Sequence, residues 1–251
     1  MIGAVIQARM NSSRLPGKVL RKVAGRPLLE FLLERLAASQ RIEKIVLATS
    51  LEHDDNEIAA CGGSFGVPVY RGSQEDVLDR FYQAAQKHDM EHVVRLTGDC
   101  PLIDPGICDR LIDFYLDRKV DYAALSPGFA EGLDCEVVSF AALARSHREA
   151  ELRSEREHVT LYVRNHPEFF SSLRLENNVD DSRFRVTVDD PEDLEVVSAV
   201  ISHFAALSGR CDAPWQQVKA FLAQHPHIAA INAHIERNEG LRISLANDGK
   251  A

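Results

Sequence analysis

The sequence has no CxxC cysteine pair, no long hydrophobic run and no excess of positive charge. Its five cysteines are scattered over 251 residues, a pattern typical of reduced thiols in a cytoplasmic protein. No apolar stretch approaches the roughly 20 residues of a membrane-spanning helix, and the N-terminus lacks the features of a secretory signal. A net charge of −9 argues against broad affinity for nucleic acid or anionic membranes. We therefore expect a cytoplasmic protein that binds neither.

Acidic residues are absent from the N-terminal segment, where positive charge gathers instead. No Asp or Glu precedes Glu30, and residues 8–18 read ARMNSSRLPGK directly after an apolar run at 2–7. Small residues let backbone N–H groups approach an anion, and basic side chains add charge. The Walker A pattern is absent, and the alternative is a solvent-facing turn. The anion-binding interpretation is favoured, and it rests on Arg9, Ser12, Ser13, Arg14 and Lys18.

Apolar runs alternate with helical periodicity, which predicts an α/β fold with a mainly parallel sheet. Strands are predicted at 2–7, 44–49, 67–70, 92–96, 121–125 and 135–138, and helices at 27–38, 105–117, 140–150, 154–165, 191–207 and 214–224. Ser73 is expected to cap another helix, with Asp76 three residues later. Residues 169–175 and 184–188 are expected to form a strand pair. We expect one domain, 1–251, with a C-terminal helical elaboration over about 190–245.

Two predicted strands each end in an aspartate. Asp99 follows Thr97-Gly98 after the strand at 92–96, and Asp189 follows the expected strand at 184–188. Ligands of open α/β sheets bind at the carboxyl ends of the strands. Two carboxylates from two strand ends could hold one magnesium ion over a triphosphate. The alternative is ordinary turns, and Asp190 before Pro191 is a good helix N-cap.

Weaker candidates have structural alternatives of similar weight. Arg71 and Ser73 could face a nucleotide, or Ser73 could serve only as a cap. Asp134 could contact a sugar hydroxyl or lie in a turn. Residues 155–158 could bind substrate or form an ordinary first helical turn. Within this segment the substrate candidates are Arg156, Glu157 and His158.

The chain resembles the nucleotidyltransferases that activate sugars, in particular the cytidylyltransferases of sugar acids and their SpsF-like branch. The resemblance begins with Ala8-Arg9, Ser12, Arg14, Pro16 and Lys18. It extends over nearly the whole chain, through Arg71-Gly72-Ser73, Asp76-Val77-Leu78-Asp79-Arg80, Thr97-Gly98-Asp99-Cys100-Pro101, Gly132-Leu133-Asp134, Ser154-Glu155-Arg156-Glu157-His158, Val188-Asp189 and Asn232-Ala233-His234.

This resemblance implies a glycosyltransferase A-type three-layer fold, and a reaction of a nucleoside triphosphate, CTP by preference, with a sugar or sugar acid. The products are an NMP-sugar for surface polysaccharide synthesis and pyrophosphate, with Mg²⁺ as cofactor. Ala8, Arg9, Arg14 and Lys18 then line the nucleotide site, and Asp99 and Asp189 ligate the metal. The expected catalytic residues are Arg14, Lys18 and Asp99. The two cations would stabilise the departing phosphates, and Asp99 would act as a ligand of the metal.

Three points stay open at the sequence level. Sugar-acid enzymes usually have an acidic residue where Cys100 follows Asp99, so the sugar is not defined. A homodimer is an open alternative to a monomer. Two other functions compete: a glycosyltransferase that consumes a nucleotide sugar, although an Asp-x-Asp motif is absent after the strand at 92–96, and a non-catalytic nucleotide-binding module.

Overall fold

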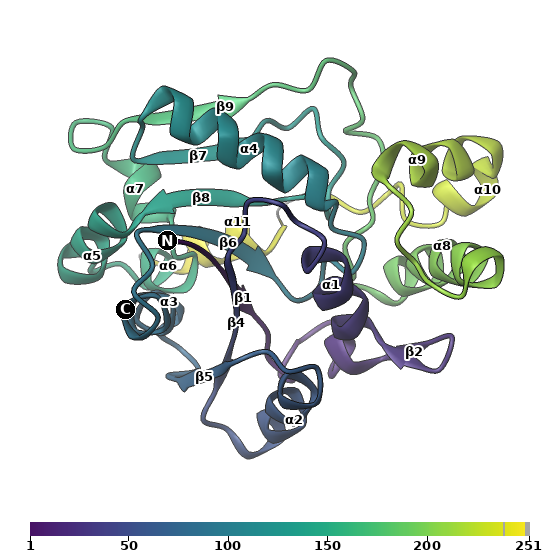
Figure 1. The fold of residues 1–251 in the computed structure, drawn as a ribbon, viewed down its shortest axis with the longest axis horizontal. Coiled ribbons are helices and arrows are strands. Elements are labelled where there is room, and N and C mark those ends of the chain that lie inside the picture. The colour runs from purple at the N-terminus through teal and green to yellow at the C-terminus, as the bar shows by residue number, and fades with distance from the viewer. Residues whose placement is uncertain (238, 249–251) are drawn as a thin grey trace.

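A seven-stranded sheet forms the centre of the protein, in a computed structural model that describes residues 1–237 and 239–248 (Figure 1). Its strands are β1 (Ile2–Gln7), β4 (Lys44–Ser50), β5 (Val69–Gly72), β6 (His92–Thr97), β7 (Tyr122–Leu125), β8 (Glu136–Ser139) and β9 (Ser172–Leu175). They lie in the order β5-β4-β1-β6-β8-β7-β9. Only β8 is antiparallel to its neighbours, β6 and β7, and the other pairings in the sheet are parallel.

Helices cover both faces of the sheet and give three layers. One face packs against α1 (Leu28–Leu36), α2 (Asn56–Ser64), α4 (Pro105–Arg118), α8 (Pro191–Ser208) and α9 (Trp215–Gln224). The other packs against α3 (Val77–Lys87), α5 (Phe140–Glu149) and α7 (Leu161–Asn165). The remaining elements are η1 (Lys18–Leu20), β2 (Lys22–Val23), β3 (Arg26–Pro27), η2 (His53–Asp55), α6 (Arg153–Glu157), α10 (Pro226–Ala229) and α11 (Glu239–Asn247).

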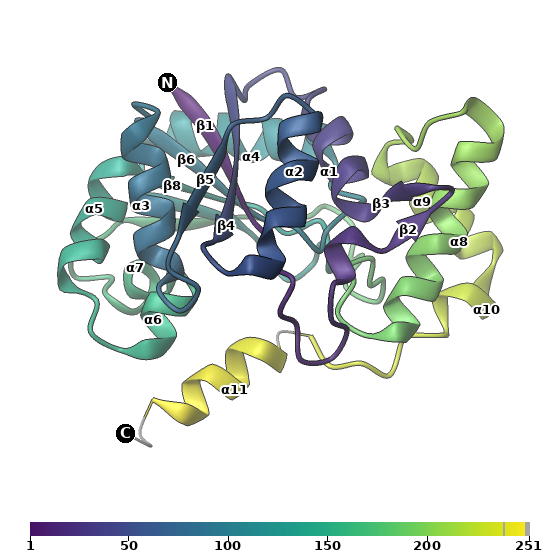
Figure 2. The same cartoon turned by 90° about the horizontal axis from the view of Figure 1, so that it is seen from below.

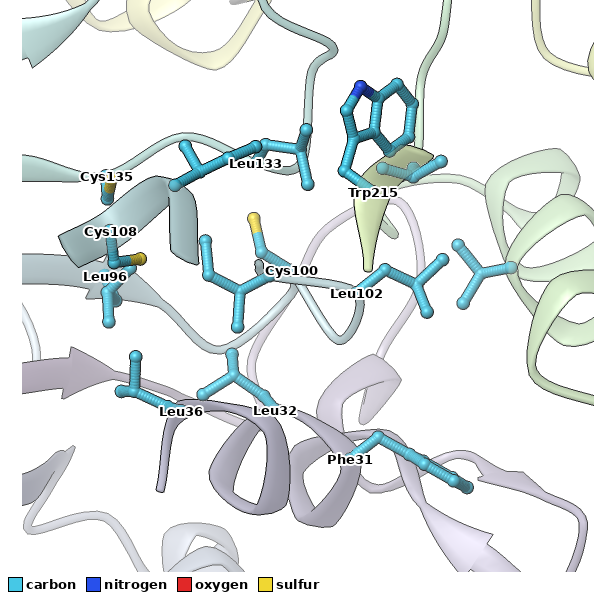
Figure 3. Packing of buried hydrophobic residues seen from close by; sticks show 14 of the residues in the cluster. Phe31, Leu32, Leu36, Leu96, Cys100, Leu102, Cys108, Leu133, Cys135 and Trp215 are labelled. Atoms are coloured by element: carbon cyan, nitrogen blue, oxygen red, sulfur yellow. The ribbon is translucent and has the colours of Figure 1, made fainter. Parts of the chain in front are cut away.

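Strand β1 shows why the apolar runs become buried strands. Successive side chains of a strand point to opposite faces. Ala4 and Ile6 enter the core on the α1 side, whereas Val5 enters the core on the α3 side. Both cores are therefore filled from one uninterrupted apolar segment, as expected for a sheet covered on both faces. Figure 3 shows the α1 side, where Leu32 of α1 packs beneath Cys100.

The three-layer, mainly parallel fold predicted from the sequence is confirmed, and most predicted elements lie within a few residues of their expected bounds. The helix expected over 154–165 is wrong in one respect, because it divides into α6 and α7. Val159 interrupts it with a φ of 36°, a conformation that a β-branched residue rarely adopts. None of the described helices combines the length and apolar character needed to cross a membrane. The single-domain organisation stays a prediction.

The strand pair expected from residues 169–175 and 184–188 is also wrong. Strand β9 pairs in parallel with β7 at the sheet edge. Residues 184–188 run as an extended segment that makes one isolated bridge, between Glu131 and Arg185. The Phe184 ring packs edge-on against Trp215, so tertiary packing gives this segment its alternating apolar pattern.

Candidate functional site

A cavity of about 880 Å³ opens at the carboxyl ends of β1 and β6. Residues 7–9 at the end of β1 and residues 97–100 at the end of β6 form part of its wall. Helix α11 also lines it and lies apart from the sheet, beside α6 (Figure 2). The volume falls in the range of pockets that hold cofactors and small substrates.

Lys18 lies between two carboxylates in this cavity. Its Nζ is 2.6 Å from Oδ2 of Asp99 and 2.7 Å from Oδ1 of Asp189. Burial by itself lowers the pKa of Lys18, but the two carboxylates outweigh it and the pKa is raised. Burial by itself raises the pKa of Asp99, but Lys18 outweighs it and lowers that pKa to about 2. Lys18 and Asp99 are therefore both charged at neutral pH.

Close approach of two strand ends places Asp99. The backbone N–H of Gly98 donates to the carbonyl of Gln7 at 2.7 Å. A Cβ at residue 98 would lie 2.9 Å from Cβ of Ala8 and 3.1 Å from that carbonyl oxygen, so only glycine fits without displacement. The extended segment 184–188 then joins this loop, because Val188 N–H donates to the Asp99 carbonyl at 2.8 Å.

A buried ion network fixes Asp189 from the other side. Arg185 donates to Asp189 at 3.2 Å and to Asp193 at 2.8 Å, and it pairs with Glu131 at 2.5 Å. Burial opposes ionisation of Asp193, but Arg185 and further hydrogen bonds hold its pKa below the ordinary value. Asp193 also accepts from the Asp190 N–H, which completes the predicted cap of α8.

Arg14 lies in a second cluster of carboxylates next to Lys18. Its guanidinium is 2.8 Å from Asp190, 3.1 Å from Asp189 and 3.0 Å from Glu239 of α11. An incoming triphosphate would compete with these carboxylates for the same cation. The side chain is about one-third exposed, so it can exchange partners at modest cost.

A buried polar cluster forms another part of the cavity wall, on β6, β7 and β8. Glu136 accepts from Arg95 at 2.6 Å, from the Tyr122 hydroxyl at 2.5 Å and from Thr160 at 3.0 Å. Burial opposes ionisation of Glu136, but Arg95 and Arg164 hold its pKa below the ordinary value. Burial also raises the pKa of Tyr122, which keeps its hydroxyl protonated as a donor. Glu136 thus fixes this wall, and the remaining N–H groups of Arg95 can meet a polar acceptor in the cavity.

Most of the predicted site residues come together in the cavity. Its lining includes Ala8, Arg9, Ser12, Ser13, Arg14, Lys18, Asp99, Asp134, Glu157, His158 and Asp189. Burial lowers the pKa of His158, which favours the neutral ring. Asp134 pairs with Arg237 at 2.8 Å, and Glu157 accepts from Ser244 of α11 at 2.9 Å.

Three predicted residues lie outside the cavity lining and have structural contacts. Arg71 donates to the carbonyls of Ser50 and Glu52 at 2.8 and 2.9 Å. The Ser73 hydroxyl accepts from the Asp76 N–H, while the cap of α3 is Asp76 itself rather than Ser73. Arg156 pairs with Asp76 and so joins α6 to α3.

Sequence reasoning missed several polar residues of the cavity wall. Arg80 lies inside a helical pattern, and Arg95 and Glu136 lie inside apolar strands. A charge within an apolar strand was the available signal, because such a group is seldom buried unless it is paired. The pattern alone does not show that Arg95 and Glu136 face each other across β6 and β8.

The donor set suits a divalent cation only if phosphate completes it. Among the described residues, no group of three or more His, Cys, Asp or Glu side chains is arranged to hold a metal. Asp99 and Asp189 do converge on one point, with Lys18 between them. Magnesium binds through one or two carboxylates together with substrate phosphates and water. These two side chains therefore fit such an ion, and their ligand role stays a prediction.

Comparison with known proteins gives the family. The cytidylyltransferase family profile matches residues 3–225. The chain is 37% identical over 203 residues to the spore coat polysaccharide biosynthesis protein SpsF of Bacillus subtilis, which covers 78% of this chain and 84% of that protein. It is 35% identical over 235 residues to the uncharacterized protein MJ1063 of Methanocaldococcus jannaschii, covering 93% and 95% of the two chains.

A solved structure agrees in both fold and sequence. The structure of a cytidylyltransferase from Leptospira borgpetersenii superposes with a TM-score of 0.85 at 34% identity. The match covers 91% of this chain and 96% of that one. Because the family profile extends over most of its length, the chain belongs to the cytidylyltransferase family and is a nucleotidyltransferase.

Proposed function

We propose that this enzyme joins CMP from CTP to a sugar or sugar acid and releases pyrophosphate, for the synthesis of a surface polysaccharide. The observation that carries the proposal is the placement of Lys18 between Asp99 and Asp189 in the cavity. A sugar hydroxyl attacks the α-phosphorus, a new P–O bond forms, and the bond to the β-phosphate breaks. The family and the name of the SpsF relative support the nucleotide and the pathway class.

The phosphate end of the reaction is assigned to the N-terminal loop. Lys18 and Arg14 meet the triphosphate, and the charge that builds up on the departing pyrophosphate is stabilised by these cations. Gly17 adopts a left-handed conformation with a φ of 68°, and its N–H donates to the Met10 carbonyl at 2.9 Å. The loop is therefore turned back on itself and holds Lys18 in place before substrate arrives.

Magnesium is proposed as the cofactor, with Asp99 and Asp189 as its protein ligands. When bound, the ion would neutralise charge on the triphosphate. Without a cation, the carboxylates around Arg14 and Lys18 would repel the substrate phosphates. Lys18 partly offsets this repulsion, because its ammonium group lies within 2.7 Å of both aspartates.

The acceptor is proposed to bind near the cluster around Glu136. The wall there presents guanidinium N–H donors from Arg95 and Arg164, while the hydroxyls of Tyr122 and Thr160, which donate to Glu136, can accept a hydrogen bond. Such donors suit the hydroxyls of a sugar and the carboxylate of a sugar acid. Reduced thiols are consistent with a cytoplasmic site of action, since the five cysteines are free and four of them are buried.

The test is pyrophosphate release by purified protein with CTP, Mg²⁺ and a panel of sugar acids and sugar phosphates. We expect release with CTP and at least one acceptor, and loss of release in Lys18→Met. Lys22→Met, four residues away and exposed, is the matched control and should retain activity. No release from any combination, with an established cytidylyltransferase active in parallel, would contradict the proposal.

A further inference from the structure

Asp55 is a buried carboxylate that lies outside the cavity. It is the last residue of η2 and is 2% exposed, whereas its neighbour Asp54 is exposed. The sequence presents the two aspartates as equals in a polar turn. An aspartate is seldom fully buried unless its charge is paired or hydrogen-bonded. The donors that meet Asp55 are uncharged backbone N–H and hydroxyl groups, so its burial depends on hydrogen bonds.

The two oxygens of this carboxylate serve two different segments. Oδ1 accepts from the Met10 N–H at 2.7 Å, in the N-terminal loop of residues 8–18. Oδ2 accepts from the Ser50 N–H at 3.0 Å and from the hydroxyls of Thr49 and Ser50, at the end of β4. Burial by itself raises the pKa of Asp55, but these hydrogen bonds outweigh it and lower the pKa. Asp55 is therefore ionised at neutral pH, and both oxygens act as acceptors.

Parallel pairing of β1 with β4 brings the two segments together. Gln7 lies opposite Ala48 in the register, and the Ala8 N–H donates to the Ala48 carbonyl at 3.1 Å. The loop therefore leaves β1 beside the end of β4, and η2 begins three residues after that strand. Neither Asp55 nor Met10 belongs to the cavity lining, so their contact supports the loop from outside the site.

Met10 is the residue through which this support reaches Lys18. The Met10 carbonyl accepts from the Ser12 N–H at 3.0 Å and from the Gly17 N–H at 2.9 Å. Gly17 directly precedes Lys18, the first residue of η1. Met10 thus donates to Asp55 outside the loop and accepts from two residues within it. Loss of the Asp55 contact would release the turn that carries Lys18 from this attachment to the sheet edge.

Only a carboxylate can satisfy both segments. Each oxygen of Asp55 faces a backbone N–H, one from the loop and one from β4. An asparagine has one acceptor oxygen and one NH₂ group that only donates. It could accept from Met10 or from Ser50, and the other N–H would then face a donor inside a buried site. An unpaired buried donor is costly, so the position requires an aspartate rather than any polar residue.

We propose that Asp55 is a positioning residue that locks the N-terminal loop in the arrangement that receives the triphosphate. This inference rests on the proposed function, because it assumes that the cations of the loop meet the phosphates. The contact orders the loop during folding instead of during binding, which increases the affinity for nucleotide. Only molecules with an ordered loop are ready to bind, so release of the loop lowers the apparent affinity in proportion to the ordered fraction.

Steady-state kinetics of Asp55→Asn test this role by separating KM from kcat. We expect KM for CTP to rise at least about tenfold, because the unpaired donor favours the released loop. The kcat at saturating CTP should stay within about threefold of wild type, because bound triphosphate restores the ordered loop. KM for the acceptor should not change. Asp54→Asn removes an equal charge from the exposed neighbour, so this matched control should keep wild-type constants.

Hydrogen exchange of the nucleotide-free protein measures the loop directly. We expect the amides of residues 8–18 to exchange at least about fivefold faster in Asp55→Asn than in wild type, and CTP to slow them again. Thr49→Val is the structural control, because it removes one donor to Oδ2 and leaves the Met10 contact intact. It should lower the melting temperature while loop exchange and KM for CTP stay at wild-type values.

Melting temperature alone does not decide the test, because Asp55→Asn also removes a negative charge that acts on the buried Arg80. A measurement on wild type is independent of how the variant folds. The chain has three methionines, so ¹⁵N-methionine labelling gives few amide signals, and Met10→Leu identifies that of Met10. We expect strong protection of the Met10 amide without nucleotide. Rapid exchange there, while the buried Met90 amide stays protected, would overturn the inference.

The remaining contrary results are equally specific. Unchanged loop exchange in Asp55→Asn would limit the residue to the turn after β4 and overturn the inference. Faster exchange with an unchanged KM for CTP would also overturn it, because the order of the loop would then not limit nucleotide binding. A wild type that releases no pyrophosphate with CTP would overturn the proposed function, and loop exchange in the same samples would still decide whether Asp55 holds the loop.

Discussion

Nζ of Lys18 lies 2.6 Å from Oδ2 of Asp99, although 81 positions separate the two residues in the sequence. This contact joins the basic loop after β1 to the loop after β6. The sequence presents the two segments as a cation cluster and a separate Gly-Asp turn. In the fold they are one site, because β1 and β6 are parallel neighbours and their carboxyl ends meet at the same edge.

Replacing Lys18 with Met tests the role of this contact in catalysis. The variant removes the charge that faces the departing phosphates, so we expect kcat/KM for pyrophosphate formation to fall about 10²- to 10³-fold. Steady-state kinetics with saturating acceptor measure the change. Lys22→Met controls for loss of a nearby positive charge. A Lys18→Met enzyme within threefold of wild type would contradict a direct role.

The same contact predicts how stability depends on pH. The pKa of Asp99 is lowered from 3.8 to about 2, so its stabilising contribution is complete above pH 4 and is lost as the pH falls toward 2. The pKa of Lys18 is raised above 10.5, so its contribution is complete below that pH and is lost at more alkaline values.

The difference in unfolding free energy between wild type and Lys18→Met should therefore be steady from pH 5 to 9 and shrink below pH 4. Urea titrations at several pH values measure it, and a constant difference down to pH 2 would refute the assignment.

The fold was predictable where burial on both faces leaves a continuous apolar run. Strand β1 and the strand at Lys44–Ser50 have this pattern and were found in the expected places. The segment 184–188 has an equally regular pattern but pairs with no sheet strand, because its alternation reflects Phe184 packing on Trp215. Local periodicity reports which side chains are buried and does not report what they are buried against.

The site was predictable in its loops and not in its wall. Lys18, Asp99 and Asp189 lie next to glycines or at expected strand ends, so local chemistry identified them. Arg80 gave no such signal, because it lies inside a helical pattern, and the signal at Glu136, a charge within an apolar strand, does not identify its partner. Their roles depend on tertiary contacts that only the fold brings together.

Gly98 tests how closely β1 and β6 must approach. Gly98→Ala would place a Cβ 2.9 Å from that of Ala8, so the strand ends must separate and Asp99 must move. We expect a lower melting temperature and at least a tenfold loss of kcat. Gly63→Ala on α2 is the control, because a Cβ there meets nothing within 4 Å and alanine favours the helix by about 0.5–1 kcal/mol. Activity close to wild type in Gly98→Ala would show that the close approach is dispensable.

Glu239 tests whether α11 competes with the nucleotide for Arg14. Its carboxylate is 3.0 Å from Nη1 of Arg14, which also contacts Asp190. Glu239→Gln keeps the shape of the side chain but weakens its hold on the guanidinium, so phosphate should displace it more easily. We expect CTP to bind several-fold more tightly in calorimetry at low salt, with the gain decreasing as salt screens the carboxylate.

The charge-matched control for this prediction is Glu195→Gln, an exposed position on α8. It changes the net charge of the protein equally but lies outside the cavity lining, so the CTP dissociation constant should stay at the wild-type value. Tighter CTP binding in both variants would show that the net charge of the protein, and not the contact with Arg14, causes the gain in affinity. Weaker CTP binding in Glu239→Gln alone would contradict competition. It would mean that the contact between Glu239 of α11 and Arg14 holds the guanidinium in a position that the triphosphate needs.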